Sequence, residues 1–127
     1  MTTTVRVVSG GYTEDEGAEA AKTLLADRPP TAVIAANDLC AIGILDTAFR
    51  AGVQVPRQLS VIGYDDSRFG RIPGIELTSV RQDIPRMARQ ALRAVVDRLD
   101  RPAHKPRDVV VRPKLIVRDT TARPGEG

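Results

Sequence analysis

Four side chains that follow successive apolar segments of this sequence could together hold a small molecule. Tyr12, Asn37, Asp65 and Gln82 offer an aromatic ring, two amides and a carboxylate. Hydroxyl groups need paired hydrogen-bond donors and acceptors, and a ring needs a flat apolar partner, so the set suits a polyhydroxylated or heterocyclic ligand. Structural explanations stay open for each residue. Asn37 could be only a helix N-cap, Asp65 a turn residue, Gln82 an exposed side chain, and Tyr12 an edge-packing ring.

A second chemistry is conceivable in the same region, because Asp38, Asp65 and Asp66 could form a magnesium site of the phosphoryl-transfer or receiver kind. Paired carboxylates at the end of a strand suit that chemistry. Two features oppose it: no Lys follows a neighbouring apolar segment, and the Ser-Gly-Gly at residues 9–11 is too short for a phosphate-binding loop. We therefore expect no enzyme and no metal or cofactor, and the magnesium site remains the less favoured alternative.

Nucleophilic catalysis has little support, because the chain contains one His and one Cys. His104 lies among Pro and Lys residues, where exposure is expected. Cys40 lies in the most apolar predicted helix, so we expect a small core residue rather than a nucleophile. A single Cys also excludes an intramolecular disulfide and cannot by itself build a zinc site.

The composition predicts one domain with an aliphatic core. The chain has 127 residues, of which 42% are hydrophobic and 28% charged, but only two Phe, two Tyr and no Trp. No apolar run approaches the roughly 18 residues that a membrane span needs. The first residues lack the charged and apolar regions of a signal peptide. These features predict a cytoplasmic protein with no membrane partner.

The formal charge of +3 is unevenly distributed. Residues 1–63 carry 5 basic and 7 acidic side chains, whereas residues 64–127 carry 14 and 9. Such a bias could mark a nucleic-acid face. The basic residues are nearly all Arg, however, spread singly among Asp and without the aromatic residues that stack on bases. We therefore expect an ordinary solvated, Arg-rich surface.

Strands and helices are predicted to alternate along the chain. Short apolar or β-branched runs bounded by Gly, Pro or Asp predict strands at residues 5–8, 32–36, 59–64, 77–81, 108–112 and 114–118. The run at 32–36 is continuously apolar, which is typical of a strand buried in a parallel sheet.

Two helices are predicted in the first half. Thr13 and Glu16 form a capping box, and the Arg-Pro-Pro at residues 28–30 stops the helix that follows. A second helix over residues 39–51 is capped by Asn37 or the Asp after it. Because this helix is apolar on most sides, we expect it to be buried on two of them.

A third helix is predicted over residues 84–99, with a Pro near its start and an apolar stripe opposite an Arg-rich face. The order of elements implies an α/β fold with a parallel, doubly wound sheet and right-handed crossovers. Ligands bind such sheets just beyond the carboxyl ends of the strands. The four candidate ligand residues follow those ends, so we expect them to share one edge of the sheet.

Five motifs occur in order along the chain. They are Pro-Thr-Ala-Val-Ile-Ala-Ala-Asn-Asp at 30–38, Val-Pro at 55–56, Leu-Ser-Val-Ile-Gly-Tyr-Asp-Asp at 59–66, Leu-Thr-Ser-Val-Arg-Gln at 77–82, and Arg-Pro-Lys-Leu-Ile-Val-Arg-Asp-Thr-Thr at 112–121. As a linked series they resemble the C-terminal part of the effector-binding domain of a LacI-family (lactose-repressor-like) transcriptional regulator. The resemblance runs from about residue 5 to 121.

The resemblance implies one lobe of a periplasmic-binding-protein-like sensor domain. In such proteins a small effector binds between two lobes and controls DNA binding by a helix-turn-helix headpiece. By position, Asn37 and Asp65 match residues that bind the effector, Gln82 matches a further polar contact, and Tyr12 matches a ring against the ligand. The effector would be a sugar or a nucleoside-like molecule. No headpiece is expected in this chain, so DNA would be bound only through a segment outside it.

The resemblance also implies how the chain divides. Residues 1–82 and 113–121 would form the C-terminal lobe, residues 83–112 an excursion that packs on an N-terminal lobe, and residues 122–127 a frayed tail. The first lobe is expected to be missing, so the apolar stripe of the third helix would need another surface. We expect self-association of the chain or a mobile segment at 83–108.

A homodimer is also implied, because the family's dimer face lies on this lobe. The candidate contacts are Ile42, Phe49, Phe69 and Ile72. Core packing is the competing explanation, and it is slightly favoured for Phe49. A lobe of a periplasmic sugar-binding protein is the alternative with the same architecture, but the ending at residues 115–121 favours a regulator.

Overall fold

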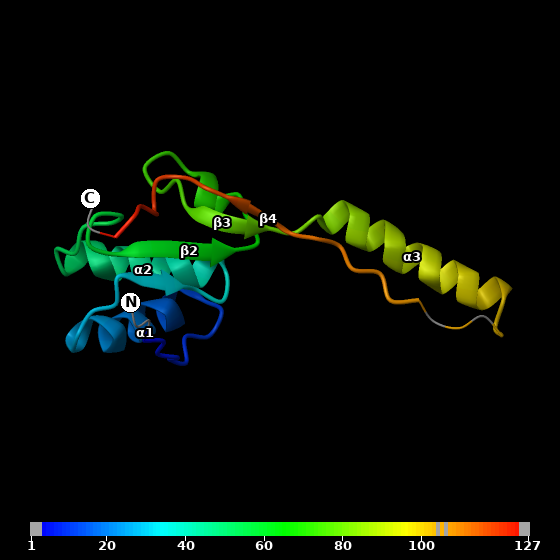
Figure 1. The fold of residues 1–127 in the computed structure, drawn as a ribbon, viewed down its shortest axis with the longest axis horizontal. Helices are drawn as coiled ribbons and strands as arrows, with labels where there is room; N and C mark the ends of the chain where they lie inside the picture. Colours follow the sequence, from blue (N-terminus) through cyan, green and yellow to red (C-terminus); the bar gives the residue numbers. More distant parts are fainter. Residues whose placement is uncertain (1–3, 104, 106, 125–127) are drawn as a thin grey trace.

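The chain folds into a layered body from which one long helix projects (Figure 1). The computed structural model describes residues 4–103, 105 and 107–124, so His104 lies outside the described residues. The elements are α1 (Glu14–Ala26), β1 (Ala32–Ile34), α2 (Asp38–Arg50), β2 (Ser60–Tyr64), the short 3-10 helix η1 (Phe69–Arg71), β3 (Thr78–Arg81), α3 (Ile84–Asp100) and β4 (Lys114–Ile116).

The strands form one mostly parallel sheet in the order β1-β2-β3-β4. β2 pairs in parallel with β1 and with β3, whereas β4 is antiparallel to β3. The predicted α/β fold is therefore confirmed. Because β1, β2 and β3 run in one direction, their carboxyl ends lie at one edge of the sheet.

The three predicted helices are confirmed, and the capping signals explain where they begin. The Thr13 hydroxyl accepts from the Glu16 amide at 3.3 Å, while Glu16 Oε2 accepts from the Thr13 amide at 3.1 Å. Asn37 caps α2, since its Oδ1 accepts from the Cys40 amide at 2.8 Å. Asp83 caps α3 in the same way, and Pro85 lies in the first turn. Each cap satisfies amides that the helix itself leaves free.

Helix α2 lies between α1 and the sheet, as its apolar sequence predicts. Its inner residues join the aliphatic core, whose buried members are Ala21, Ala35, Cys40, Ala41, Ile44, Ala48, Leu59, Val61 and Leu77. Cys40 is only 2% exposed, which confirms its assignment to the core. Two glycines bring α1 and α2 close together. A Cβ at Gly17 would lie 2.2 Å from the Cys40 carbonyl oxygen, and one at Gly43 would lie 1.9 Å from that of Glu14.

Two predicted strands do not form, and a third is less buried than expected. Residues 5–8 form no strand, because Arg6 donates to the Leu24 and Asp27 carbonyls and so holds this segment along the end of α1. β1 therefore has a strand partner on one side only, and Ile34 is 77% exposed. Residues 108–112 also form no strand, because the chain that leaves β3 opposite them has already turned into α3.

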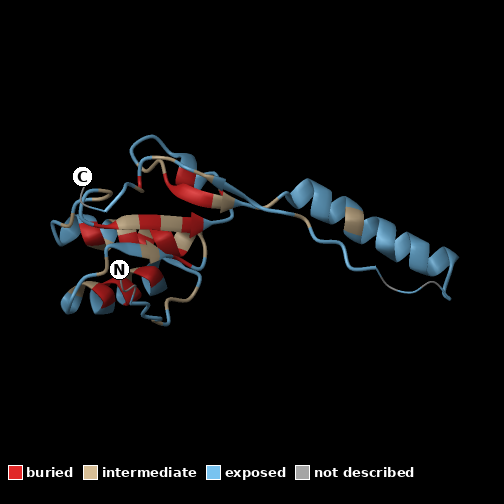
Figure 2. Cartoon of the chain, viewed as in Figure 1, coloured by how far each residue is buried: buried red, intermediate tan, exposed pale blue. Residues whose placement is uncertain are grey.

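Helix α3 projects from the body, and none of its residues is buried (Figures 1 and 2). Its apolar stripe is open to solvent, with Leu92 66% and Leu99 75% exposed. The helix is connected to the body through residues 82–83 on one side and the segment before β4 on the other. No helix within the described part of the chain is long and apolar enough to span a membrane.

Gly43→Ala is expected to lower the free energy of unfolding by about 1–3 kcal/mol, because overpacking a tight contact costs that much. Urea unfolding followed by circular dichroism measures the change. Gly10→Ala is the control, since its Cβ would meet the Ala20 side chain at an ordinary 3.4 Å. Equal losses in the two variants would contradict the close contact between α1 and α2 as the cause.

Candidate functional site

The edge of the sheet formed by the carboxyl ends of β1, β2 and β3 carries three of the four predicted ligand residues. Asp65 directly follows β2, Gln82 directly follows β3, and Asn37 lies between β1 and α2. Gln82 Nε2 donates to Asp65 Oδ1 at 3.1 Å. Asp65 is exposed and Gln82 is half-buried, so a ligand can reach both.

Asn37 and Tyr12 form a second pair. Asn37 Nδ2 donates to the Tyr12 carbonyl at 2.9 Å, and the Tyr12 side chain is left 70% exposed. Because residues 5–8 form no strand, Tyr12 is placed by the start of α1 rather than by a strand end. The structural explanation for Asn37 as an N-cap is confirmed. An amide has two N–H groups and two acceptor lone pairs, so Asn37 still has one of each for a ligand.

The chain makes an unusual turn where β2 ends. Asp65 has a φ of 109° and Asp66 a φ of 50°, both positive. The Asp65 amide donates to the Val80 carbonyl at 2.9 Å, and the Asp66 amide donates to Ser79 Oγ at 3.0 Å. As a result the two neighbouring carboxylates have opposite surroundings: that of Asp65 is exposed and that of Asp66 is fully buried.

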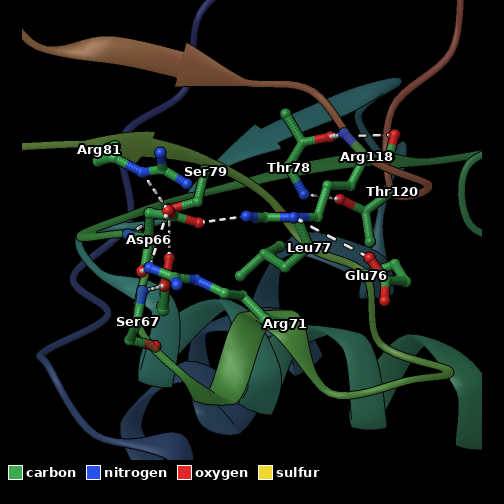
Figure 3. A network of polar contacts seen from close by, with 11 residues as sticks. Asp66, Ser67, Arg71, Glu76, Leu77, Thr78, Ser79, Arg81, Arg118 and Thr120 are labelled. Carbon is green, nitrogen blue, oxygen red and sulfur yellow. Dashed lines mark hydrogen bonds and ion pairs between the residues drawn. The ribbon is translucent and has the colours of Figure 1, made fainter.

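Three guanidinium groups converge on the buried Asp66 carboxylate (Figure 3). Arg118 Nη2 donates to Oδ1, while Arg81 Nε and, at 3.1 Å, Arg71 Nη2 donate to Oδ2. Arg71 Nη2 also donates to the Asp66 carbonyl at 2.6 Å. We call Asp66 and these three arginines the Asp66 hub. Burial raises the pKa of Asp66, but the hydrogen bonds from Arg118 and Arg81 and the charges of Arg118 and Arg71 outweigh it and hold the pKa below its usual value.

A second buried carboxylate, that of Asp38, ties α2 to the same turn. Asp38 is 1% exposed and accepts from the Ser67 amide at 2.6 Å and from Ser79 Oγ. Ser79 Oγ in turn accepts from the Asp66 amide. A Cβ at Gly63 would lie 2.3 Å from Asp38 Oδ1, so only glycine leaves room for this carboxylate beside β2.

The geometry opposes the magnesium alternative. Both oxygens of Asp66 accept from guanidinium groups, Asp38 is bonded to a backbone amide and a hydroxyl, and Asp65 accepts from Gln82. Over the residues that the structure describes, no group of three or more His, Cys, Asp and Glu side chains could hold a metal ion. The carboxylates of the three aspartates thus have separate partners.

Sequence reasoning missed the Asp66 hub. It assigned the Arg-rich second half to a solvated surface, but the Arg118 side chain is only 13% exposed. The only available signal was the pair of Asp residues after β2. Neighbouring residues after a strand tend to face opposite ways, so one carboxylate of such a pair is turned inward and needs cationic partners.

The predicted dimer contacts lie on the surface. Phe49 is 82% exposed, so its core-packing explanation is wrong, and Ile72 and Phe69 are 45% and 38% exposed. Ile42 and Phe49 line a groove of about 960 Å³ between α2 and the loops before β2 and β3. Phe69 and Ile72 lie in and after η1 and do not line this groove.

Comparison with known proteins gives consistent relatives. Residues 2–121 match the periplasmic binding protein-like domain. The HTH-type transcriptional regulator MalR of Streptomyces coelicolor is 37% identical over 112 residues, which cover 87% of this chain and 33% of MalR. The chain therefore spans about a third of the length of the curated relatives that it matches.

Solved structures agree with the sequence comparison. A LacI transcriptional regulator from a Rhodococcus species is 47% identical and superposes with a TM-score of 0.81, covering 88% of this chain and 41% of that protein. The transcriptional regulator CelR in complex with cellobiose is 35% identical with a TM-score of 0.81, covering 87% of this chain and 34% of CelR.

Asp66→Asn is expected to lower the free energy of unfolding at pH 7 by about 3 kcal/mol, because it removes the charge that pairs with the largely buried Arg118 guanidinium. The folded-state pKa of Asp66 is lowered, whereas a free Asp has a pKa of about 4. The charge therefore stabilises the fold above that pH, and this stabilisation is lost as the pH falls through the folded-state pKa.

Urea unfolding of both proteins from pH 7 downward measures this effect. The difference in unfolding free energy should be largest near pH 7 and shrink below about pH 4. Asp46→Asn is the control, because it removes only the exposed ion pair with Arg50, which is worth under about 1 kcal/mol. A difference that stays constant with pH would contradict a lowered pKa at Asp66.

Proposed function

The chain belongs to the periplasmic binding protein-like domain family, as the C-terminal part of a LacI-type effector-binding domain, and we propose that it senses a small polar effector for such a regulator. The effector would be a sugar or related polyol, and its binding would control DNA binding by a headpiece outside these residues. A regulator of this kind works in the cytoplasm, where its DNA is.

The observation that carries this proposal is the exposed hydrogen bond between Asp65 and Gln82. Asp65 Oδ1 accepts from Gln82, which leaves Asp65 Oδ2, the Gln82 carbonyl oxygen and one Gln82 N–H for a ligand. Two acceptors beside one donor fit neighbouring hydroxyl groups, which can each donate and accept. Asn37 would add a further amide, and the exposed ring of Tyr12 a flat apolar face. The cellobiose bound by CelR supports a sugar.

A regulator is favoured over a periplasmic sugar-binding protein by the relatives. MalR and the Rhodococcus protein are described as transcriptional regulators, and both cover most of this chain. A two-lobed architecture alone would not separate the two classes, since it provides the same cleft. The relatives also favour a regulator over an enzyme, which agrees with the separate partners of Asp38, Asp65 and Asp66.

Helix α3 has the character expected of the excursion at residues 83–112. It is amphipathic and has no buried residue. It begins at Ile84, two residues after Gln82 and directly after its cap at Asp83. Its exposed apolar stripe would pack on an N-terminal lobe, which would also supply the opposite wall of the ligand cleft. Residues 1–82 and 113–121 would then form the C-terminal lobe.

We also propose that the full-length protein forms a homodimer. The apolar groove lined by Ile42 and Phe49 lies away from the ligand edge, on the side of the loops that precede β2 and β3. An aromatic ring that is 82% exposed beside such a groove suits burial against a second copy. Phe69 and Ile72, on the loop after β2, would extend the contact.

Asp65→Ala in the full-length regulator is expected to weaken sugar binding by about 5- to 150-fold, because leaving ligand hydroxyls unpaired costs about 1–3 kcal/mol. Isothermal titration with a panel of cellobiose, sucrose, maltose and ribose measures the affinities. Glu19→Gln, on the exposed side of α1 and outside the groove, is the control and should bind as the wild type does. An unchanged affinity in Asp65→Ala would reject Asp65 as a ligand residue.

Phe49→Asp is expected to weaken dimerisation of the full-length protein by at least tenfold, because it places a charge in an apolar interface. Sedimentation equilibrium measures the dimer dissociation constant. Val7→Asp is the control, since Val7 is 91% exposed and lies outside the groove. A dimer that is unaffected by Phe49→Asp would place the interface elsewhere.

A further inference from the structure

Asp65 has a backbone conformation that a residue with a side chain rarely adopts. Its φ of 109° lies in a region that only glycine enters without strain, whereas the φ of 50° at Asp66 is a left-handed value that Asp and Asn tolerate. Such strain costs of order 1–3 kcal/mol and persists only when the surroundings enforce it. A glycine at position 65 would avoid the strain. The presence of Asp there therefore indicates that its carboxylate has a role at this position.

The surroundings that enforce the conformation are on both sides of the turn. The Asp65 amide is fixed by the Val80 carbonyl and the Asp66 amide by Ser79 Oγ. The Asp66 carbonyl accepts from Arg71, and the Asp66 carboxylate accepts from all three arginines of the Asp66 hub. Main chain and side chain of Asp66 are therefore held at the same time.

Two successive cross-links join the end of β2 to the end of β3. The first is the ion pair between Asp66 and Arg81, which we call the buried link because the Asp66 carboxylate is fully buried, although Arg81 is 47% exposed. The exposed link is the hydrogen bond between Asp65 and Gln82. The members of the two links are neighbours in sequence on both strands. Fixing the buried link therefore fixes the backbone on which both members of the exposed link stand.

We propose that the Asp66 hub is a positioning device, which holds the strained turn and thereby aims the Asp65 carboxylate at Gln82. Asp66 is a positioning residue, because its carboxylate is fully buried and both of its oxygens already accept from guanidinium groups. The role of the aimed pair as a ligand site rests on the function proposed above, but the mechanical link does not. Without the hub the turn relaxes, and Asp65 and Gln82 lose their alignment while the α1–α2 core remains.

The Gln82 side-chain amide is a direct reporter of this alignment. NMR spectra of the ¹⁵N-labelled 127-residue chain are recorded for wild type, Asp66→Asn, Arg71→Gln and the surface control Glu19→Gln, with the Gln82 signal assigned by its loss in Gln82→Glu. Glu19 pairs with Lys22 on the exposed side of α1. Arg71→Gln is the milder variant, because it leaves Arg81 and Arg118 on Asp66.

We expect the Gln82 amide protons to move toward their free positions in Asp66→Asn, and part of the way in Arg71→Gln, while Glu19→Gln matches wild type. Backbone signals of α1 and α2 should stay in place in every variant. If Asp66→Asn does not fold, the position of the Gln82 amide signals in Arg71→Gln tests the proposal. Unmoved Gln82 signals in each variant that stays folded would overturn the proposal. No sugar is present, so this result is independent of the proposed function.

Strain in the turn is tested by comparing Gly and Ala at position 65. Asp65→Gly should melt roughly 4 °C above Asp65→Ala, since only glycine relieves the strain. When Arg71→Gln or Asp66→Asn is also present, the difference in melting temperature between Asp65→Gly and Asp65→Ala should become smaller, because the weakened hub lets the turn relax. Differential scanning calorimetry measures the melting temperatures. An equal gap in all backgrounds, or none in the wild-type background, would show that the hub does not hold the turn under strain.

Discussion

The buried carboxylate of Asp66 is the constraint around which one end of this molecule is organised. A carboxylate that is withdrawn from water must be paired, because an unpaired buried charge costs several kcal/mol. Here the pairing groups come from three separate segments: Arg71 in η1, Arg81 at the end of β3 and, much further along the chain, Arg118 after β4. Because desolvation offsets much of the Coulomb attraction, the main effect of the hub is geometric. The hub joins η1, the end of β3 and the segment after β4 to the turn that follows β2.

The same end of the sheet depends on close approach between layers. Asp38 can lie beside β2 only because Gly63 has no side chain, and α2 can lie against α1 only because of Gly17 and Gly43. Asp38 then bonds Ser79 and Ser67, so the start of α2 is connected to the strand ends that carry Asp65 and Gln82. Asn37, the residue before Asp38, is therefore on the same rigid framework as the other ligand candidates.

The parts of this fold that follow local rules could be predicted from the sequence. The capping box at Thr13 and the apolar surface of α2 led to the correct helices and to the burial of α2 on two sides, because both signals depend on neighbouring residues only. Residues 5–8 have good strand propensity, but a strand also needs a partner, and Arg6 holds this segment elsewhere. For the candidate site, strand ends indicated Asp65 and Gln82. The sequence could not show that Arg81 and Arg118 turn toward Asp66, since that depends on packing between distant segments.

The position of the candidate site relative to α3 gives the proposed function a physical basis. Gln82 is the last residue before the cap of α3, and within the described residues this helix is joined to the body through the segments on either side of it. A ligand bound to Asp65 and Gln82 would therefore contact the fixed end of β2 and the base of the projecting helix at once. The Asp66 hub keeps the end of β2 in place. If the ligand binds more tightly in one orientation of α3 than in another, binding would therefore shift the populations of these orientations rather than deform the sheet. A rigid turn beside the projecting helix would thus let occupancy of the proposed site favour one orientation of α3 over another.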